Sequence, residues 1–123
     1  MNLDFTSEQD MLRDSAAKFL ANEFDFDKVR ELEESDAGYS PELWEKMAEL
    51  GWLGLPFSEE AGGFGGTFMD LAIIQEEIGK ALLPSPYFST VVQCGALIAE
   101  GGTDDQKTEL IEAIASGSLI MAL

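Results

Sequence analysis

The stretch ELGWLGLPFSEEAGGFGG, residues 49–66, decides how the chain is organised. Its first part is an apolar run around Trp52, and its second part gathers four glycines in the last five residues. Gly51 can take the left-handed conformation that ends a helix. We therefore expect a helix to end there, a buried connection to follow, and a tight turn to precede the next helix.

The glycine-rich part of this stretch could also be a phosphate-binding loop. A loop of the Walker type needs lysine and then serine or threonine after its last glycine, whereas Gly66 is followed by Thr67 and Phe68. The G-x-G-x-x-G spacing of dinucleotide-binding turns is absent as well. Glu59 and Glu60 lie beside the loop and would repel a phosphate. The residues favour a turn whose glycines supply positive φ angles.

Helix signals precede this turn. Thr6 and Gln9 form a capping box in front of an apolar stripe at helical spacing, and that helix should reach about residue 22. The charged residues 27–35 are a candidate short helix. Ser40 followed by Pro41 is typical of a helix start, because serine caps and proline fits the first helical position.

Further helix signals follow the turn. Thr67 with Asp70, and Thr103 with Gln106, each place a capping threonine three residues before a side chain that can reach back. Between them, residues 88–100 are small or apolar nearly all round, which predicts a central helix. The sequence thus predicts an all-α fold, a bundle of five or six helices.

Charge and residue content exclude several classes of function. The net charge is −17, from 24 acidic and 7 basic residues, which argues against binding nucleic acid or an anionic membrane. The absence of histidine and the single cysteine exclude the usual zinc sites and an intrachain disulfide. Cys94 is expected to be buried and unreactive. A lone thiol favours a reducing compartment, so we expect a cytoplasmic location.

The last residues read differently from the rest. After Gly117, residues 118–123 have the sequence SLIMAL, an apolar run that follows a Ser-Gly-Ser turn. We expect residues 1–117 to form a helical domain and residues 118–123 to be the first strand of a β domain that follows. Continuation of the last helix is the alternative.

The order of the motifs resembles the N-terminal helical domain of flavin-dependent acyl-CoA dehydrogenases. The stretch from Leu82 to Val92 looks most like bacterial members, which include the small subunits of two-gene dehydrogenases. The resemblance covers nearly the whole chain and rests on these stretches: FTSEQ at 5–9, ELGWLGLP at 49–56, GG at 62–63, QEEIG at 75–79 and GTDDQK at 102–107.

The resemblance implies a three-domain parent protein that oxidises an acyl-CoA thioester with FAD. The flavin would lie between a β domain and a C-terminal domain, and a glutamate of the C-terminal domain would be the base. No catalytic residue is therefore expected in this chain, which by itself should be inactive. An electron-transfer flavoprotein and a homo- or heterotetramer are the implied partners.

The resemblance also assigns site residues. The start of the helix after the second proline break would wall part of the acyl-chain pocket, and Leu123 would be a weak flavin contact. The pocket residues are Tyr87, Phe88, Ser89, Thr90 and Gln93. Taken without the resemblance, these residues are also compatible with ordinary packing. A free-standing acidic helical module that binds other proteins is the alternative function.

Overall fold

The computed structural model describes residues 1–123 and confirms an all-α fold with six α-helices and no strand. A short 3₁₀ helix and a π-helix complete it. In chain order the elements are α1 (Ser7–Glu23), α2 (Phe26–Glu34), α3 (Pro41–Glu49), η1 (Glu59–Ala61), α4 (Phe68–Ala81), η2 (Phe88–Gly95), α5 (Ala96–Gly101) and α6 (Asp104–Ala115).

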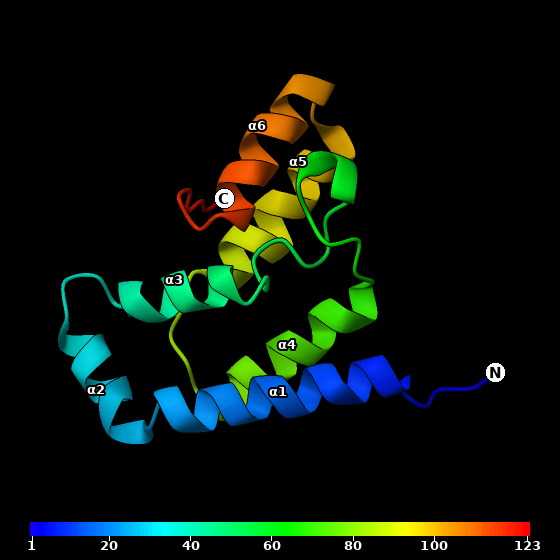
Figure 1. The fold of residues 1–123 in the computed structure, drawn as a ribbon. Helices are drawn as coiled ribbons and strands as arrows, with labels where there is room; N and C mark the ends of the chain where they lie inside the picture. Colours follow the sequence, from blue (N-terminus) through cyan, green and yellow to red (C-terminus); the bar gives the residue numbers. More distant parts are fainter.

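Helices α1 and α4 lie side by side, and α5 and α6 pack together on the other side of the molecule (Figure 1). Helices α1 and α4 run in the same direction. Gln9 near the start of α1 bonds Asp70 near the start of α4, and Arg13, one turn further along α1, pairs with Glu76, more than one turn further along α4. Helix α3 connects the two groups. Its Lys46 bonds Glu23 at the end of α1, at 2.7 Å, and its Trp44 indole donates to the carbonyl of Gly117 after α6.

The starts of α1 and α4 are joined through their capping boxes, both of which the sequence predicted. The Gln9 amide accepts from the Thr6 N–H and donates to Asp70, while Asp70 accepts from the Thr67 N–H at 2.7 Å. Burial alone would raise the pKa of Asp70, but the hydrogen bonds from Thr67 and Gln9 outweigh it, so the pKa lies below its ordinary value. The Asp70 carboxylate thus caps α4 and, through Gln9, holds α1 beside it.

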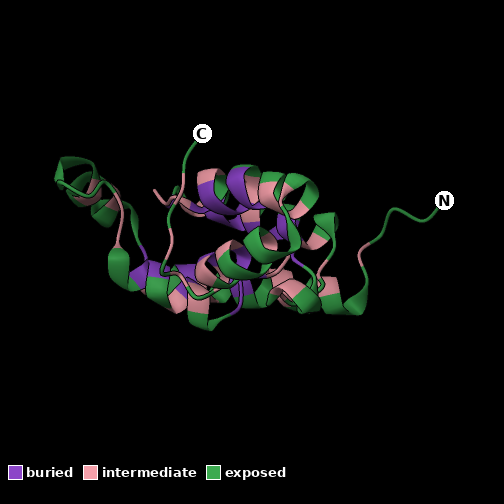
Figure 2. Ribbon diagram, turned by 90° about the horizontal axis from the view of Figure 1, so that it is seen from above, coloured by how far each residue is buried: buried purple, intermediate pink, exposed green.

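The core is one apolar cluster to which α1, α3, α4, η2 and α6 all contribute. Figure 2 shows buried positions along the facing sides of these helices, whereas α2 stands out from the body and has no buried residue. Trp52 and Leu53 are buried, which confirms that the connection after α3 packs inside. The Phe19 ring meets the Trp52 ring edge-on, with ring centroids 5.3 Å apart.

The glycine-rich stretch is a turn, as the sequence predicted. Gly62 has φ +96° and Gly65 has φ +68°, angles that favour glycine. Gly63 serves a different purpose, because a Cβ there would overlap the backbone carbonyl of Phe57. The chain folds back on itself at this point, with the Gly65 N–H donating to the same Phe57 carbonyl at 2.7 Å.

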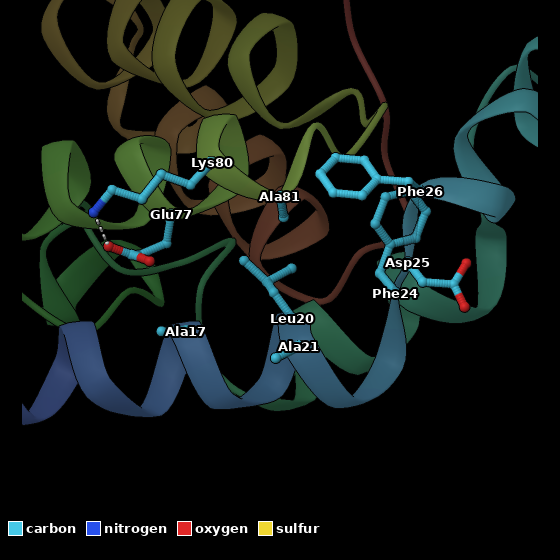
Figure 3. A pocket seen from close by; sticks show the side chains of 9 residues that line it. All are labelled: Ala17, Leu20, Ala21, Phe24, Asp25, Phe26, Glu77, Lys80 and Ala81. Carbon is cyan, nitrogen blue, oxygen red and sulfur yellow. Dashed lines mark hydrogen bonds and ion pairs between the residues drawn. The ribbon is translucent and has the colours of Figure 1, made fainter.

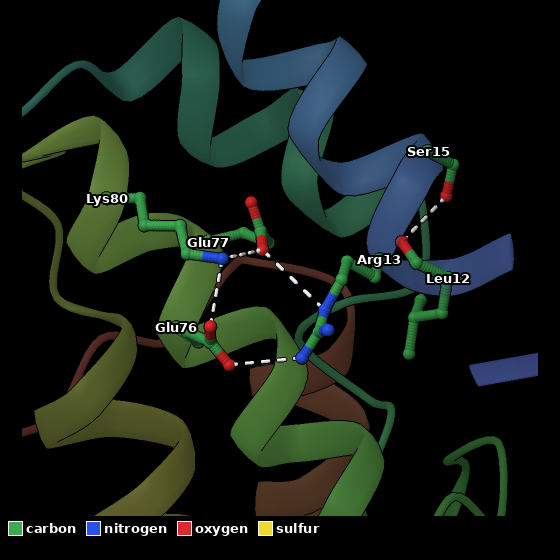
Figure 4. Close-up of polar contacts among 6 residues, drawn as sticks. All are labelled: Leu12, Arg13, Ser15, Glu76, Glu77 and Lys80. Carbon is green, nitrogen blue, oxygen red and sulfur yellow. Dashed lines mark hydrogen bonds and ion pairs between the residues drawn. The ribbon is translucent and has the colours of Figure 1, made fainter. Parts of the chain in front are cut away.

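An ion-pair network holds the middle of α1 against α4 (Figure 4). The Arg13 guanidinium lies 3.2 Å from the Glu76 carboxylate and 3.9 Å from Glu77, and it also stacks 4.2 Å over the Phe5 ring. The Lys80 ammonium reaches both carboxylates, at 2.9 and 2.8 Å. Glu77 is nearly buried, and Arg13 and Lys80 are the two cations that compensate its carboxylate.

We expect Arg13→Ala to lower the free energy of unfolding by about 1–2 kcal/mol, because it leaves the nearly buried Glu77 with one cation. Hydrogen bonding and charge from Lys80, and then the charge of Arg13, lower the pKa of Glu76 below 4.5. A lowered carboxyl pKa stabilises the fold above pH 4.5 and loses that effect as the pH falls through the folded value. The difference between variant and wild type should therefore shrink below pH 4.5.

Urea unfolding from pH 3 to 7 measures this difference. Arg30→Ala is the matched control, because Arg30 is exposed on α2 and forms no ion pair within the chain. Equal losses in the two variants would contradict a stabilising role for the network.

The predicted helix over residues 88–100 differs from expectation. Its first part, η2, is a π-helix and contributes Val91 and Cys94 to the interior, as expected for Cys94. Its second part, α5, has no buried residue, and Leu97 is exposed. The apolar sequence is thus central only over η2. No helix of the chain has the length and apolar character needed to cross a membrane.

Candidate functional site

The candidate site lies on η2, which two prolines separate from α4. Pro84 and Pro86 keep the connection out of a helix, and the Pro86 carbonyl then accepts from the Thr90 N–H at 2.9 Å. At the other end, a Cβ on Gly95 would overlap the Phe57 ring. Glycine at this position allows that ring to lie directly against the π-helix, a type of helix that is rare and often found at functional sites.

Two of the five predicted pocket residues are completely buried. The Tyr87 hydroxyl donates to the carbonyl of Trp52 at 3.0 Å, and burial raises the pKa of Tyr87 above its ordinary value. The Thr90 hydroxyl bonds the backbone of Met121. Both hydroxyls therefore have partners inside the chain, so these residues fix η2 in place rather than offer free polar groups.

The other three predicted residues lie at the surface of η2, which Tyr87 precedes as its cap residue. Phe88 is 52% exposed, Gln93 is exposed, and Ser89 is partly exposed with its hydroxyl bonded to the Pro86 carbonyl at 3.1 Å. The structure thus divides the predicted set into a buried pair and an exposed trio. The sequence run of aromatic and hydroxyl residues gave no signal for this division, because the wider turn of a π-helix changes which side chains share a face.

Residues 118–123 follow α6 without continuing it. The helix ends at Ala115, and Gly117 takes φ +79°, which excludes the alternative of a longer helix. The segment is held to the domain by the Trp44 indole on Gly117, by the Leu119 N–H on Ala113 and by Thr90 on Met121. Leu123 is 80% exposed. Within this chain the segment pairs with no strand, so its assignment as a β-strand remains a prediction.

The glycine-rich turn is not arranged to hold the diphosphate of FAD. A diphosphate needs open backbone N–H groups, but those of Gly63, Gly65 and Gly66 already donate to the carbonyls of Ser58, Phe57 and Leu55. Glu59 and Glu60 line the same loop. Leu123, the only predicted flavin contact, offers an apolar side chain and backbone alone. No group of three or more acidic or thiol side chains is arranged to hold a metal ion.

A hollow that sequence reasoning did not predict opens away from η2, where α1, α2 and the end of α4 meet (Figure 3). It has a volume of about 240 Å³ and a mostly apolar lining, including Leu20, Phe24 and Ala81. The bonded pair Glu77 and Lys80 lies at one end, 2.8 Å apart. Phe24 and Phe26 flank Asp25 at the α1–α2 junction, and Phe24 is buried whereas Phe26 is exposed. This pair of aromatic residues is the feature of the sequence that could have indicated the hollow.

This geometry defines an all-α domain, and the comparisons give its class. Residues 6–118 match the family described as "Acyl-CoA dehydrogenase, N-terminal domain". The chain belongs to this family.

Three relatives illustrate the similarity. The acyl-CoA dehydrogenase IpdE2 of Mycobacterium tuberculosis is 39% identical over 116 residues, which cover 93% of this chain and 36% of that protein. A variant of the Tcur3481-Tcur3483 steroid ACAD superposes with a TM-score of 0.85 at 30% identity, over 94% of this chain and 31% of the other. An acyl-CoA dehydrogenase from Bacillus anthracis, solved with FAD, superposes with a TM-score of 0.80 at 28% identity. The match covers 93% of this chain and 19% of the other. The chain thus spans about a third of the length of the curated relatives it matches.

Proposed function

We propose that this chain serves as the N-terminal domain of an FAD-dependent acyl-CoA dehydrogenase and that the exposed side of η2 forms part of the acyl-chain pocket. Membership of the family supports the reaction class, the α,β-dehydrogenation of an acyl-CoA thioester. The observation that carries the pocket assignment is the division of η2. Tyr87 and Thr90 are buried, and their hydroxyls hold η2 against the interior through hydrogen bonds. The outer side of η2 therefore presents Phe88, Ser89 and Gln93.

The chemistry of the exposed trio suits the tail of a substrate rather than its reacting carbons. An aromatic ring, a bonded hydroxyl and an amide form an apolar surface with a polar edge, and such surfaces bind by shape. None of the three can act as a base at neutral pH. The catalytic base and the flavin phosphates belong to the β and C-terminal domains of the proposed enzyme, with Leu123 as a minor flavin contact.

The proposal includes partners. Acyl-CoA is the substrate, an electron-transfer flavoprotein accepts the electrons, and the enzyme is a homo- or heterotetramer. The paired naming of the Tcur3481-Tcur3483 enzyme supports a heteromeric form. The single, buried Cys94 is compatible with a reducing compartment, and we place the enzyme in the cytoplasm.

Substitution of Ser89 tests the pocket assignment in the full-length enzyme that carries this domain. Ser89→Leu should fill space that a long acyl chain occupies and should lower kcat/KM for long chains much more than for short ones. Each displaced methylene costs roughly 1 kcal/mol, so we expect about five- to tenfold discrimination per methylene. The measurement is kcat/KM over a ladder of acyl-chain lengths, together with the melting temperature.

Ser15→Leu is the matched control. Ser15 lies on α1, away from η2, and its hydroxyl bonds the carbonyl three residues back at 3.0 Å, just as Ser89 bonds Pro86 (Figure 4). The control variant should leave the dependence of kcat/KM on acyl-chain length unchanged. A uniform loss over all chain lengths in Ser89→Leu, with a lower melting temperature, would remove η2 from the acyl site and leave these residues a packing role.

A further inference from the structure

The Thr90 side chain makes an unusual double contact. Its hydroxyl donates to the carbonyl of Met121 at 3.1 Å and accepts from the N–H of the same residue at 3.0 Å. Thr90 is completely buried, and its partner Met121 is partly buried. One hydroxyl thus satisfies both backbone groups of one residue, as a paired residue does in an antiparallel ladder.

No other threonine in the chain behaves in this way. Thr6, Thr67 and Thr103 cap their own helices, and the Thr108 hydroxyl bonds the carbonyl of Asp104 within α6. Return to a carbonyl of the same helix is the usual choice for a helical threonine. Thr90 instead bonds a residue 31 positions away.

The segment that Thr90 contacts has the alternation of an extended strand. Leu119 and Met121 pack partly against the core, whereas Ile120 and Ala122, which alternate with them, are exposed. The Leu119 N–H on the Ala113 carbonyl fixes the start of the segment at 3.1 Å. Beyond it, the two bonds to Thr90 are the only hydrogen bonds that residues 120–123 make within the chain.

We infer that Thr90 is a positioning residue whose hydroxyl stands in for a neighbouring strand and holds residues 119–123 extended against η2. The consequence for substrate binding rests on the proposed function. Because Thr90 lies between Ser89 and Val91 on η2, the same contact fixes the exposed side of that helix relative to the segment that leads to Leu123. Loss of the Thr90 hydroxyl therefore lets η2 and the segment that leads to Leu123 move relative to each other.

Hydrogen exchange of the Met121 amide tests this role in the 123-residue chain. In Thr90→Val, which keeps the shape but has no hydroxyl, we expect this amide to exchange about tenfold faster or more, since it loses its only acceptor. Thr90→Ser keeps the hydroxyl and should retain most of the protection. The Ile74 amide, in the buried part of α4, should not change in either variant.

Thr108→Val is the matched control, because it removes a threonine hydroxyl that bonds only within α6. Unchanged Met121 exchange in Thr90→Val would overturn the inference. If Thr90→Val also accelerates exchange of the Ile74 amide, the milder variant Thr90→Cys decides, because its thiol is only a weak donor and acceptor. In that variant the Met121 amide must still exchange faster than in wild type while the Ile74 amide stays protected. Equal protection of Met121 in Thr90→Cys and wild type would likewise overturn the inference.

The exchange experiment involves no substrate, so it is independent of the proposed function. In the full-length enzyme, Thr90→Val should also change the ratio of kcat/KM for long and short acyl chains. A faster Met121 amide with an unchanged ratio would keep the positioning role and count against the acyl pocket on η2.

Discussion

Gly63→Ala should destabilise the chain by about 3 kcal/mol, the upper part of the range for overpacking a well-packed site. The added Cβ would overlap the carbonyl oxygen of Phe57 and lie 2.6 Å from its Cβ, and backbone of this kind cannot rotate away as the end of a side chain can. The same carbonyl accepts from the Gly65 N–H, so relief of the overlap breaks a hydrogen bond of the turn. For a chain of this size the loss lowers the melting temperature by roughly 10 °C.

The effect should extend beyond the turn. The Phe57 ring is buried and lies against Gly95 at the end of η2, so a displaced Phe57 also disturbs the candidate site. Near-ultraviolet circular dichroism reports the packing of the aromatic rings, and thermal unfolding reports the stability. We expect the aromatic signal to change in Gly63→Ala even at temperatures where the helical signal persists.

Gly79→Ala is the matched control. Gly79 lies in α4, and a Cβ there would meet nothing within 4 Å. Alanine is the better helix former, so this variant should be more stable than wild type by about 0.5–1 kcal/mol. A Gly63→Ala variant that is as stable as wild type would mean that the turn relaxes freely and that residues 57–66 do not organise the fold.

The helix starts were the part of the fold that local chemistry predicted best. Thr6 with Gln9, Thr67 with Asp70, and Thr103 with Gln106 each form the reciprocal bonds of a capping box. Such signals depend only on residues three positions apart, so a single sequence contains them in full. The short charged helix also forms, as α2, one residue earlier than expected and capped by Asp25.

Features that depend on distant contacts could not be predicted in the same way. The π-helix η2 is one of them, because the ring of Phe57 and the backbone of Met121 contact it from positions far along the chain. Leu82 is another: it follows the apolar stripe of α4, yet it takes φ +53° at the helix end and is exposed. Periodicity identifies apolar positions but not where a helix stops.

The candidate site shows the same limit. The run from Tyr87 to Thr90 was identified by resemblance, whereas the division into buried and exposed members needed coordinates. The Tyr87 hydroxyl could have faced a ligand as readily as the carbonyl of Trp52, because nothing local chooses between them. Only the position of the connection after α3 decides.

Deletion of residues 119–123 should keep the chain helical but lower both its stability and its self-association. The helices and their caps are complete by Ser116, so the helical circular dichroism signal should remain. The deletion removes the Leu119 bond to Ala113, both Met121 bonds and the partial burial of two apolar side chains. A hydrogen bond is worth about 1 kcal/mol net, so we expect a loss of about 2–3 kcal/mol.

Self-association should fall because the segment offers an open edge. Its contact with Thr90 leaves the backbone groups of Ile120 and Ala122 without hydrogen bonds in the chain, and Leu123 is exposed beside them. An unpaired extended edge with apolar side chains is a template for pairing with a second copy. Sedimentation velocity over a range of concentrations measures the change.

Two controls separate the edge from general stickiness. Met11→Ser removes an apolar side chain that is 70% exposed on α1, and it should leave self-association unchanged. Leu123→Ser keeps every anchor of the segment and should weaken association without lowering the melting temperature. If the deletion instead abolishes the helical signal, the segment is an integral part of the core. If it unfolds nothing and association persists, the contact between copies lies on another face, for which the exposed side of η2 around Phe88 is the next candidate.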